Sequence, residues 1–228
     1  MDGRHDTDHK DADANTAPVT VRSTVVVPLV LADGRTVEST IYSFDGLRDG
    51  KEHFAVRLGN ASRPDPLVRL HSECVTGDVF GSARCDCGPQ LQEALRRVHE
   101  EGGYVLYLRQ EGRGIGLFAK LDAYRLQDEG HDTYAANALL GHGEDERDYG
   151  VAADMLRAIG AERIRLLSNN PDKHCQLSNE GIEIIAQVPT GVFAGKHNRR
   201  YLEAKVRRTG HRISLPAATE AGPKKSGA

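Results

Sequence analysis

The chain has 228 residues, of which 39% are hydrophobic, and its formal net charge at pH 7 is −3. This composition suffices for a globular core, and the absence of a run of 18 apolar residues excludes a membrane-spanning helix. From Lys196 onward, nine Lys and Arg residues against two Glu give a charge of +7 and leave −10 for the rest. Because the chain has no Trp to stack on bases, we expect this basic end to serve a phosphorylated small molecule rather than nucleic acid.

The two ends of the sequence differ in composition from the region between them. Residues 1–17 are mainly Asp, His, Ala and Thr, and residues 216–228 are rich in Pro, Gly, Ala and Lys. Both stretches predict disordered tails. Residues 18–215 contain no repeat or low-complexity linker and predict a single folded domain. Because residues 1–17 contain no apolar signal segment, we expect a cytoplasmic location, where thiols stay reduced.

The first half of the folded region predicts β-strands. Three runs rich in Val, Ile and Phe, at residues 23–32, 36–44 and 53–59, are separated by Asp-Gly turns, which are typical strand connections. A further short strand at residues 67–74 leads directly into the segment that holds three of the four cysteines.

From Pro89 onward, helices alternate with strands. Leu91, Leu95 and Val98 recur at helical spacing until Gly102, where the helix is expected to stop. The elements predicted after it are strands at 104–109, 163–168 and 182–188, helices at 115–130 and 147–160, a turn and helix at 169–181, and a basic amphipathic helix at 197–211. This order predicts an α/β fold in which a mixed sheet is covered by helices.

Three cysteines form the most informative local pattern. Cys74, Cys85 and Cys87 have the spacing C-x10-C-x-C, and two residues separated by one position project to the same side of an extended chain. Thiolates are soft ligands that favour Zn²⁺. Three thiolates indicate an open, catalytic zinc site, whereas His71 or the distant Cys175 as fourth ligand would make a closed, structural one. The spacing alone leaves both possibilities open.

Polar residues follow several of the predicted strands. Glu111, Gly112 and Arg113 lie in a glycine-rich strand-to-helix turn, and residues 145–148 form the charged run DERD before a helix. Ser168 ends another strand, shortly before a Pro-initiated helix. Glycines allow a ligand close to the backbone, and helix N-termini favour phosphate. Together with the cysteine segment, these loops predict a phosphorylated substrate beside a metal.

The motifs resemble those of one known family. HSECVTGDVFGSARCDCGPQLQ, RQEGRGIGL, LQDEGHDTYAANALLGHGEDERDYG, LLSNNPDK and NRRYLEAKVRRTGH follow one another in this order, and they are similar to GTP cyclohydrolase II over roughly residues 67–213. The resemblance implies a riboflavin-pathway enzyme that uses water to open the imidazole ring of GTP. The products would be formate, diphosphate and 2,5-diamino-6-ribosylamino-4(3H)-pyrimidinone 5′-phosphate. It also implies one Zn²⁺ per subunit, Mg²⁺ with the GTP phosphates, and a homodimer. Because 228 residues leave no room for the dihydroxybutanone-phosphate synthase often fused to this family, we expect a monofunctional enzyme.

The resemblance also assigns roles to individual positions. Cys74, Cys85 and Cys87 match the zinc ligands, Asp145 matches the proton acceptor, and Arg147 matches a nucleophile on the α-phosphate. Tyr124 matches a helix tyrosine near the guanine ring. The positions that match GTP contacts are Arg69, Leu70, His71, Ser72, Glu73, Gln90, Glu111, Gly112, Arg113, Thr133, Ser168 and Lys173.

Three alternatives accompany these assignments. A guanidinium is a poor nucleophile, so an electrostatic clamp on the phosphate is the second reading of Arg147. Some relatives stop at the formylated pyrimidine without releasing formate, although Tyr124 favours the full reaction. A zinc-stabilised nucleotide-binding protein without turnover is the third alternative. Cys175 matches no family position and is predicted to be an ordinary buried thiol on a helix.

Overall fold

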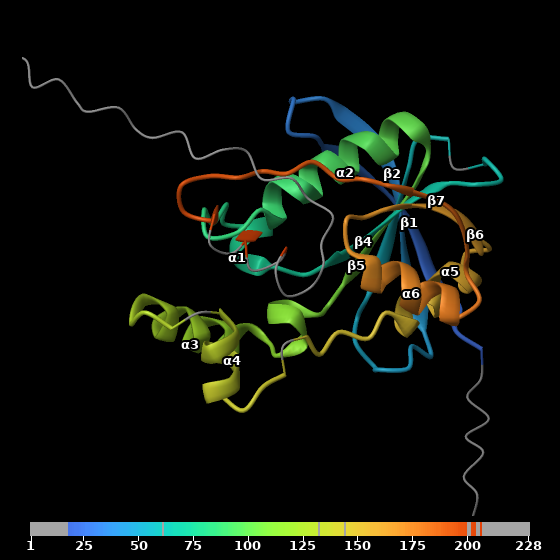
Figure 1. Cartoon of the computed structure of the whole chain (residues 1–228). Helices are drawn as coiled ribbons and strands as arrows, with labels where there is room; N and C mark the ends of the chain where they lie inside the picture. Colours follow the sequence, from blue (N-terminus) through green and yellow to red (C-terminus); the bar gives the residue numbers. More distant parts are fainter. Residues whose placement is uncertain are drawn as a thin grey trace, which may run out of the picture.

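The computed structural model describes residues 18–60, 62–131, 133–143, 145–199, 202, 203 and 206 (Figure 1). The predicted tails, and most of the basic helix predicted at residues 197–211, lie outside the described residues. Within the described part of the chain, no helix is long and apolar enough to cross a lipid bilayer.

One mixed sheet of seven strands organises the described residues, with strand order β1-β2-β3-β5-β4-β6-β7. Strands β1, β2, β3 and β5 are antiparallel neighbours, whereas β5, β4, β6 and β7 run parallel. The predicted α/β class with a mixed sheet is therefore confirmed. The strands are β1 (Thr20–Val30), β2 (Thr36–Asp45), β3 (Phe54–Leu58), β4 (Leu67–Ser72), β5 (Gly103–Leu108), β6 (Arg163–Leu167) and β7 (Glu183–Val188).

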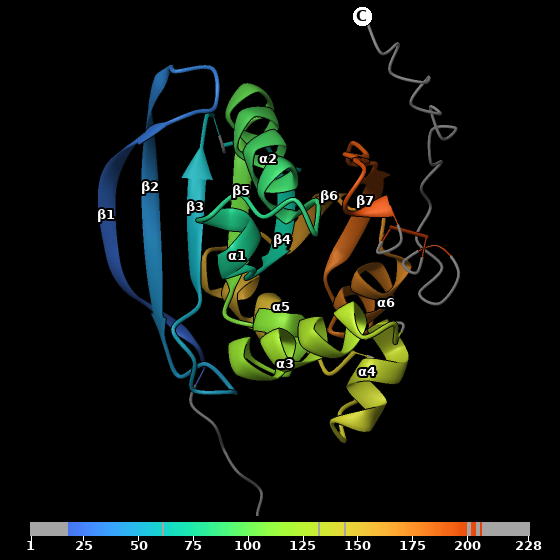
Figure 2. The ribbon, with the colours of Figure 1, turned by 90° about the vertical axis from the view of Figure 1, so that its left-hand side faces the viewer.

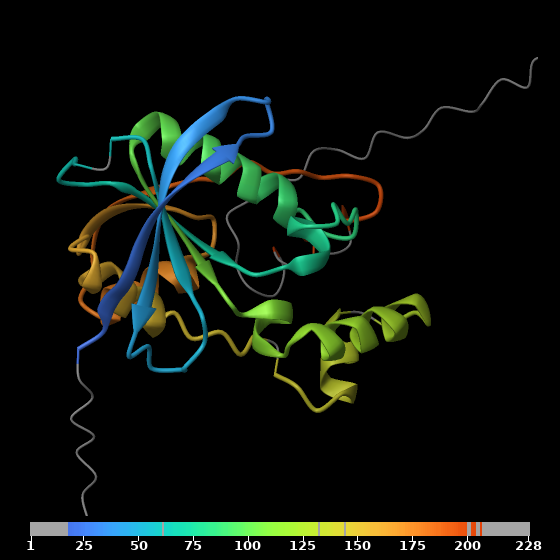
Figure 3. The same cartoon turned by 180° about the vertical axis from the view of Figure 1, so that it is seen from behind.

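The helices connect the parallel half of the sheet. Figure 2 shows α2 lying across β4 and β5, and Figures 1 and 3 show α3 and α4 as an arm that stands beside the sheet below α1. The helical elements are α1 (Val75–Asp78), α2 (Cys87–Glu101), the 3₁₀ turn η1 (Glu111–Gly114), α3 (Leu117–Asp128), α4 (Thr133–Leu139), α5 (Gly150–Ala158) and α6 (Pro171–Asn179).

Pro28 illustrates why β1 lies at the edge of the sheet. A proline cannot donate a hydrogen bond to a neighbouring strand, so it is tolerated where one side of the strand is unpaired. In the described sheet β1 pairs with β2 alone. The Asp33-Gly34 turn closes this hairpin, and Gly34 adopts a φ of 82°, which glycine reaches without steric cost.

Two apolar cores lie on opposite faces of the sheet. The larger core packs strand residues against α5 and α6 and includes Val68, Leu70, Leu106, Ile164, Met155, Leu156 and Leu177. The smaller core packs the other face against α2 and includes Leu58, Leu67, Val105, Ala94 and Val98. Because each strand alternates its side chains between the faces, apolar residues fill both cores.

Strand β4 uses this alternation to bring polar groups to the α2 side. Val68 and Leu70 pack into the larger core. Arg69 and His71 point to the opposite face, where they form hydrogen bonds with residues of α2 and α1. The central strand therefore supports the core with one set of residues and the site with the other.

Two helices were absent from the sequence-based prediction. Helix α1 has only four residues and lies inside the segment of residues 74–87 that holds the three cysteines, which we call the metal loop. Helix α4 has seven residues. Elements this short carry too little hydrophobic periodicity to be recognised, because isolated helices of one or two turns depend on tertiary contacts for stability.

Candidate active site

The three predicted zinc ligands come together. Cys74 precedes α1, Cys87 begins α2, and Cys85 lies in the turn before it. Their three Sγ atoms lie within 4.8 Å of one another, and Cys74 and Cys85 are buried. Gly77 makes this packing possible, because a Cβ atom there would lie 2.8 Å from the Sγ of Cys85. The cluster has the donor chemistry that zinc prefers.

Neither candidate for a fourth protein ligand joins this cluster. His71 Nε2 lies 3.0 Å from both carboxylate oxygens of Asp78. His71 does not belong to the group of side chains that lie close enough together to bind one metal ion, which consists of the three cysteines. Cys175 is exposed on α6, so the prediction that it is buried was wrong. It occupies the solvent-facing side of a helix whose buried residues are Lys173 and Leu177.

Asp78 ties His71 to the metal loop. One of its carboxylate oxygens also accepts hydrogen bonds from the Cys74 backbone N–H at 3.0 Å and from the Tyr107 hydroxyl at 2.9 Å. Burial lowers the pKa of His71, although the hydrogen bond with Asp78 opposes this effect. This arrangement holds the backbone of Cys74 in place from the β4–β5 side.

Lys120 of α3 contacts the cluster and was not predicted. Its Nζ atom lies 3.1 Å from Cys74 Sγ, 3.0 Å from Thr76 Oγ1 and 2.8 Å from Glu111 Oε1. Hydrogen bonds with Cys85, Cys87 and Lys120 hold the pKa of Cys74 well below its usual value. The sequence feature that could have identified Lys120 is its position four residues before Tyr124, which places both side chains on one face of a helix.

The turn η1 uses unusual backbone angles to present its polar groups. Gly112 and Arg113 both have φ of 63°, and Arg113 is the only non-glycine residue with positive φ in the described part of the chain. Residues held in this left-handed region cluster at functional sites. The Glu111 carboxylate anchors the turn, because it accepts hydrogen bonds from the backbone N–H groups of Val75 and Gly112 at 2.7 and 2.8 Å.

The DERD segment packs against this turn. The backbone N–H of Glu146 donates to the carbonyl of Arg113 at 3.0 Å. Arg147 Nε donates to Asp145 Oδ1 at 2.7 Å, and Arg147 Nη2 donates to the second carboxylate oxygen, Oδ2. Burial alone would raise the pKa of Asp145, but the hydrogen bonds from Arg147 outweigh it and keep the pKa below its ordinary value. Asp145 is therefore a carboxylate at neutral pH.

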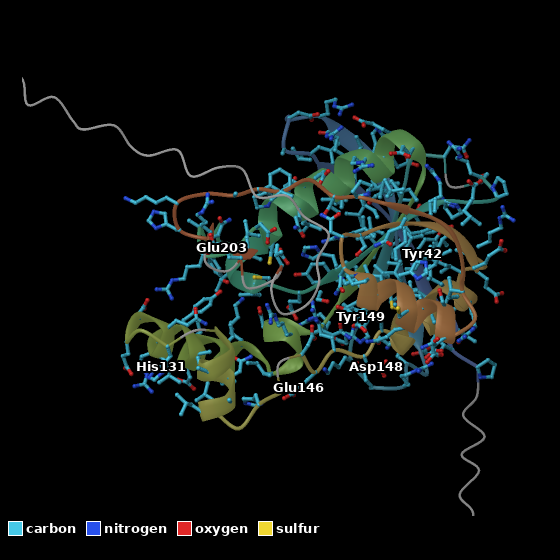
Figure 4. All side chains as sticks on the ribbon, in the orientation of Figure 1. Tyr42, His131, Glu146, Asp148, Tyr149 and Glu203 are labelled. Atoms are coloured by element: carbon cyan, nitrogen blue, oxygen red, sulfur yellow. The ribbon has the colours of Figure 1, made fainter. Side chains whose placement is uncertain are left out.

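A single cavity joins these parts. Its volume is about 410 Å³, within the usual range for small-molecule sites. The α3–α4 arm contributes to its wall, including His131, which is labelled on the arm in Figure 4. The predicted residues that line it are Ser72, Glu73, Cys74, Cys85, Cys87, Glu111, Gly112, Arg113, Tyr124 and Arg147.

Apart from Thr133, of which the structure describes the backbone alone, the other predicted positions do not line this cavity. Leu70 has a fully buried side chain, and its carbonyl accepts a hydrogen bond from Lys173 Nζ at 2.8 Å. Arg69 is buried and donates to the Leu167 carbonyl and to Gln90 Oε1. The remaining positions are His71, bound to Asp78; Asp145, paired with Arg147; Ser168, bonded within its own turn; and Thr133, the first residue of α4.

Tyr149 is a further residue that the sequence analysis missed. Its side chain is fully buried beside α6 (Figure 4). The cationic groups of Arg147 and Lys173 lie 5.6 Å and 5.2 Å from its ring centroid, within the range of cation–π attraction. Burial raises the pKa of Tyr149 to about 12. A neutral aromatic ring therefore lies close to both cations. The sequence feature that could have identified Tyr149 is its position directly after DERD.

Tyr124 of α3 lies at the cavity wall near two cations. The Arg84 guanidinium lies 4.9 Å and Lys120 Nζ 5.7 Å from its ring centroid. Arg84 belongs to the segment between Cys74 and Cys85 and pairs with Asp128 at the end of α3. The metal loop and the arm are therefore joined around this tyrosine.

Comparison with known proteins identifies the family. A family model described as GTP cyclohydrolase II matches residues 30–189. GTP cyclohydrolase-2 of Vibrio cholerae serotype O1 is 51% identical over 181 residues, 78% of this chain and 91% of that protein. Riboflavin biosynthesis protein RibBA of Bacillus cereus is 53% identical over 169 residues, 73% of this chain and 43% of that protein. A solved two-domain 3,4-dihydroxy-2-butanone 4-phosphate synthase from A. baumannii matches with TM-score 0.41 and 19% identity, over 78% of this chain and 42% of that one. This last similarity is too low to add to the assignment. The chain belongs to the GTP cyclohydrolase II family of enzymes.

Proposed function

We propose that the chain is a zinc-dependent GTP cyclohydrolase II of riboflavin biosynthesis. Its products would be 2,5-diamino-6-ribosylamino-4(3H)-pyrimidinone 5′-phosphate, formate and diphosphate. The observation that supports this most is a cavity lined both by three thiols and by the side chains of Arg113 and Arg147. A nucleoside triphosphate whose base is to be hydrolysed needs both a hydrolytic centre and cations for its phosphates.

The donor set fits a zinc ion. Three soft sulfur ligands lie close together, Gly77 leaves space beside them, and His71 is engaged by Asp78. This supports the open arrangement, in which Cys74, Cys85 and Cys87 bind zinc and water completes the site. When bound, zinc would supply Lewis-acid activation of water for hydrolysis of the imidazole ring.

Arg113 and Arg147 would bind the phosphates of GTP at one end of the cavity. Arg147 is held by Asp145 in a bidentate pair, and a guanidinium with pKa above ~12 is a weak nucleophile. We therefore favour the clamp reading, in which Asp145 orients Arg147 toward the α-phosphate and the phosphates carry Mg²⁺. Ser72, Glu73 and the η1 backbone would contact the nucleotide from the same cavity.

The buried predicted positions support the site from beneath. Lys173 binds the Leu70 carbonyl and Arg69 binds the Leu167 carbonyl and Gln90. These contacts hold β4 beside β6 and α6, so Ser72 and Glu73 keep their positions at the end of β4. The proposed homodimer rests on the family resemblance, and the proposed cytoplasmic location rests on the composition of the sequence.

Product analysis tests the proposal. Purified protein with GTP and Mg²⁺ should release formate and diphosphate in equal amounts. Diphosphate without formate would indicate the variant that retains the formyl group, which Tyr124 at the cavity wall argues against. GTP binding with no product would favour the nucleotide-binding protein without turnover.

Zinc content separates the open site from the closed one. Cys85→Ser should lose zinc and formate release together, and Cys175→Ser, on the exposed face of α6, is the matched control that should retain both. His71→Ala should keep one zinc per chain. A zinc-free His71→Ala protein that remains folded would contradict the open site.

A further inference from the structure

Lys120 is a buried cation whose contacts the proposed reaction does not explain. It lies on α3 with 8% of its surface exposed, although lysine is rarely buried without a specific partner. Its ammonium group has three N–H donors and no acceptor. The three acceptors within reach are Cys74 Sγ, Thr76 Oγ1 and Glu111 Oε1, at 3.1, 3.0 and 2.8 Å.

This geometry makes Lys120 a fixed donor rather than a mobile substrate-binding lysine. All three N–H groups have protein acceptors, and those acceptors come from the residue before α1, from α1 itself and from η1. Glu111 is in turn held by two backbone N–H groups. The ammonium is therefore locked against the sulfur from two sides.

We propose that Lys120 is a positioning residue for the metal centre: it donates an N–H···S hydrogen bond to Cys74 and compensates the negative charge of the thiolate cluster. This inference rests on the proposed zinc site. Three thiolates, one Zn²⁺ and the Glu111 carboxylate together carry a net charge of −2, which the Lys120 ammonium reduces to −1. An uncompensated charge is unfavourable in such a buried setting. Groups hydrogen-bonded to metal ligands tune both metal affinity and the electronic properties of the ligands.

Two substitutions separate the charge from the hydrogen bond. Lys120→Met keeps the approximate length of the side chain and removes both properties, whereas Lys120→Gln keeps N–H donors without the charge. Lys51→Met, at an exposed lysine in the β2–β3 connection, is the control. Each protein is purified with zinc, its affinity is measured by competition with a chelator, and the Co²⁺-substituted form is examined by near-ultraviolet absorption.

Lys120→Met should bind zinc about 10- to 100-fold more weakly, the range typical for loss of a partner of a metal ligand. Its sulfur-to-cobalt charge-transfer band should move to longer wavelength, because a thiolate without a hydrogen bond is a stronger electron donor. Lys120→Gln should show the weaker affinity with a smaller spectral shift. Lys51→Met should match the unmodified protein.

Two results would overturn the inference. Affinity and spectrum unchanged in both Lys120 variants, with only the melting temperature lowered, would mean that Lys120 merely joins α3 to the metal loop. If Lys120→Met does not fold, an unchanged zinc affinity and cobalt spectrum in Lys120→Gln would be enough to show that Lys120 only joins α3 to the metal loop. An unmodified protein that binds neither zinc nor cobalt would refute the zinc dependence itself, so the two failures are distinguishable.

Discussion

Gly77 shows how little space the thiolate cluster leaves for a neighbouring side chain. A Cβ atom at this position would lie 2.8 Å from Cys85 Sγ and 3.2 Å from Cys74 Sγ. Such contacts are too short for a rigid loop to accommodate, and the sulfur atoms would have to separate. Metal sites tolerate only small departures from their ligand distances. We therefore expect the thiolate cluster to require a glycine, with no Cβ atom, at position 77.

Gly77→Ala should therefore lose most of its zinc while the protein remains folded. The expected result is well below one zinc per chain after dialysis, measured by metal analysis, with formate release lost in proportion. Gly195→Ala is the control, because a Cβ there would lie 3.8 Å from the nearest side-chain atom. Full zinc occupancy in Gly77→Ala would show that the loop adjusts more easily than these distances indicate.

Asp145 provides a test of charge at the proposed phosphate end. Its pKa in the folded protein lies below the ordinary value because of Arg147. A carboxyl group with a depressed pKa contributes stability above its unfolded pKa of about 3.9, and this contribution is lost as the pH falls through the folded value.

Asp145→Asn should lower the melting temperature at pH 7, because it leaves Arg147 and the nearby Arg113 without their carboxylate. The difference from the unmodified protein should stay constant down to about pH 5 and shrink below about pH 4, where the wild-type carboxyl group itself becomes protonated. Thermal unfolding at several pH values measures this. A difference that grows toward acid pH would contradict the assigned ion pair.

At the level of elements, Arg48 connects the antiparallel and parallel halves of the fold. It lies in the β2–β3 connection and forms a bidentate pair with Asp154 of α5 at 2.7 and 2.8 Å. It also reaches Glu180 after α6, at 2.9 and 3.1 Å. Gly150 allows this path, because a Cβ atom there would lie 2.0 Å from the guanidinium.

Arg48→Met should destabilise the protein by about 1–2 kcal/mol, more than an isolated exposed pair, because several charge-assisted bonds share one guanidinium. Chemical denaturation measures the change. Arg22→Met is the control: its pair with Asp45 is 3.9 Å long and both side chains are largely exposed, so its effect should be near zero. Equal effects of the two substitutions would count against the network.

Across the whole molecule, the metal loop and the α3–α4 arm form a part distinct from the two cores. No cysteine belongs to either described core. Polar contacts join the loop to the arm, through Lys120 with Cys74 and Thr76 and through Arg84 with Asp128. The sheet therefore has its own apolar stabilisation, whereas the position of the arm depends on the loop.

Removal of zinc by a chelator should consequently loosen one region rather than unfold the chain. We expect the far-ultraviolet circular dichroism to change little, while amide hydrogen exchange increases in residues 74–87 and 111–128. Restoring zinc should reverse the change. A uniform increase that includes β4, β5 and β6 would mean that the metal stabilises the whole fold.

Local sequence patterns predicted the strands and the group of three cysteines. All seven strands were predicted because Val-, Ile- and Leu-rich runs bounded by glycine report their own conformation, and the cysteine spacing identified the thiolate group because its members lie within 14 residues. The short helices α1 and α4 escaped detection because their stability comes from tertiary contacts.

Only the tertiary structure decided which polar and charged side chains contact one another. Lys120 contacts Cys74 across 46 positions, His71 pairs with Asp78 rather than with the thiolates, and the Tyr149 ring lies near both Arg147 and Lys173. No spacing rule encodes these pairs, since they depend on how α3, α1 and α6 pack on the sheet. Local sequence determined the elements and the ligand types, because both follow from neighbouring residues. Packing determined which charges meet, because a buried charge is unfavourable unless it is paired.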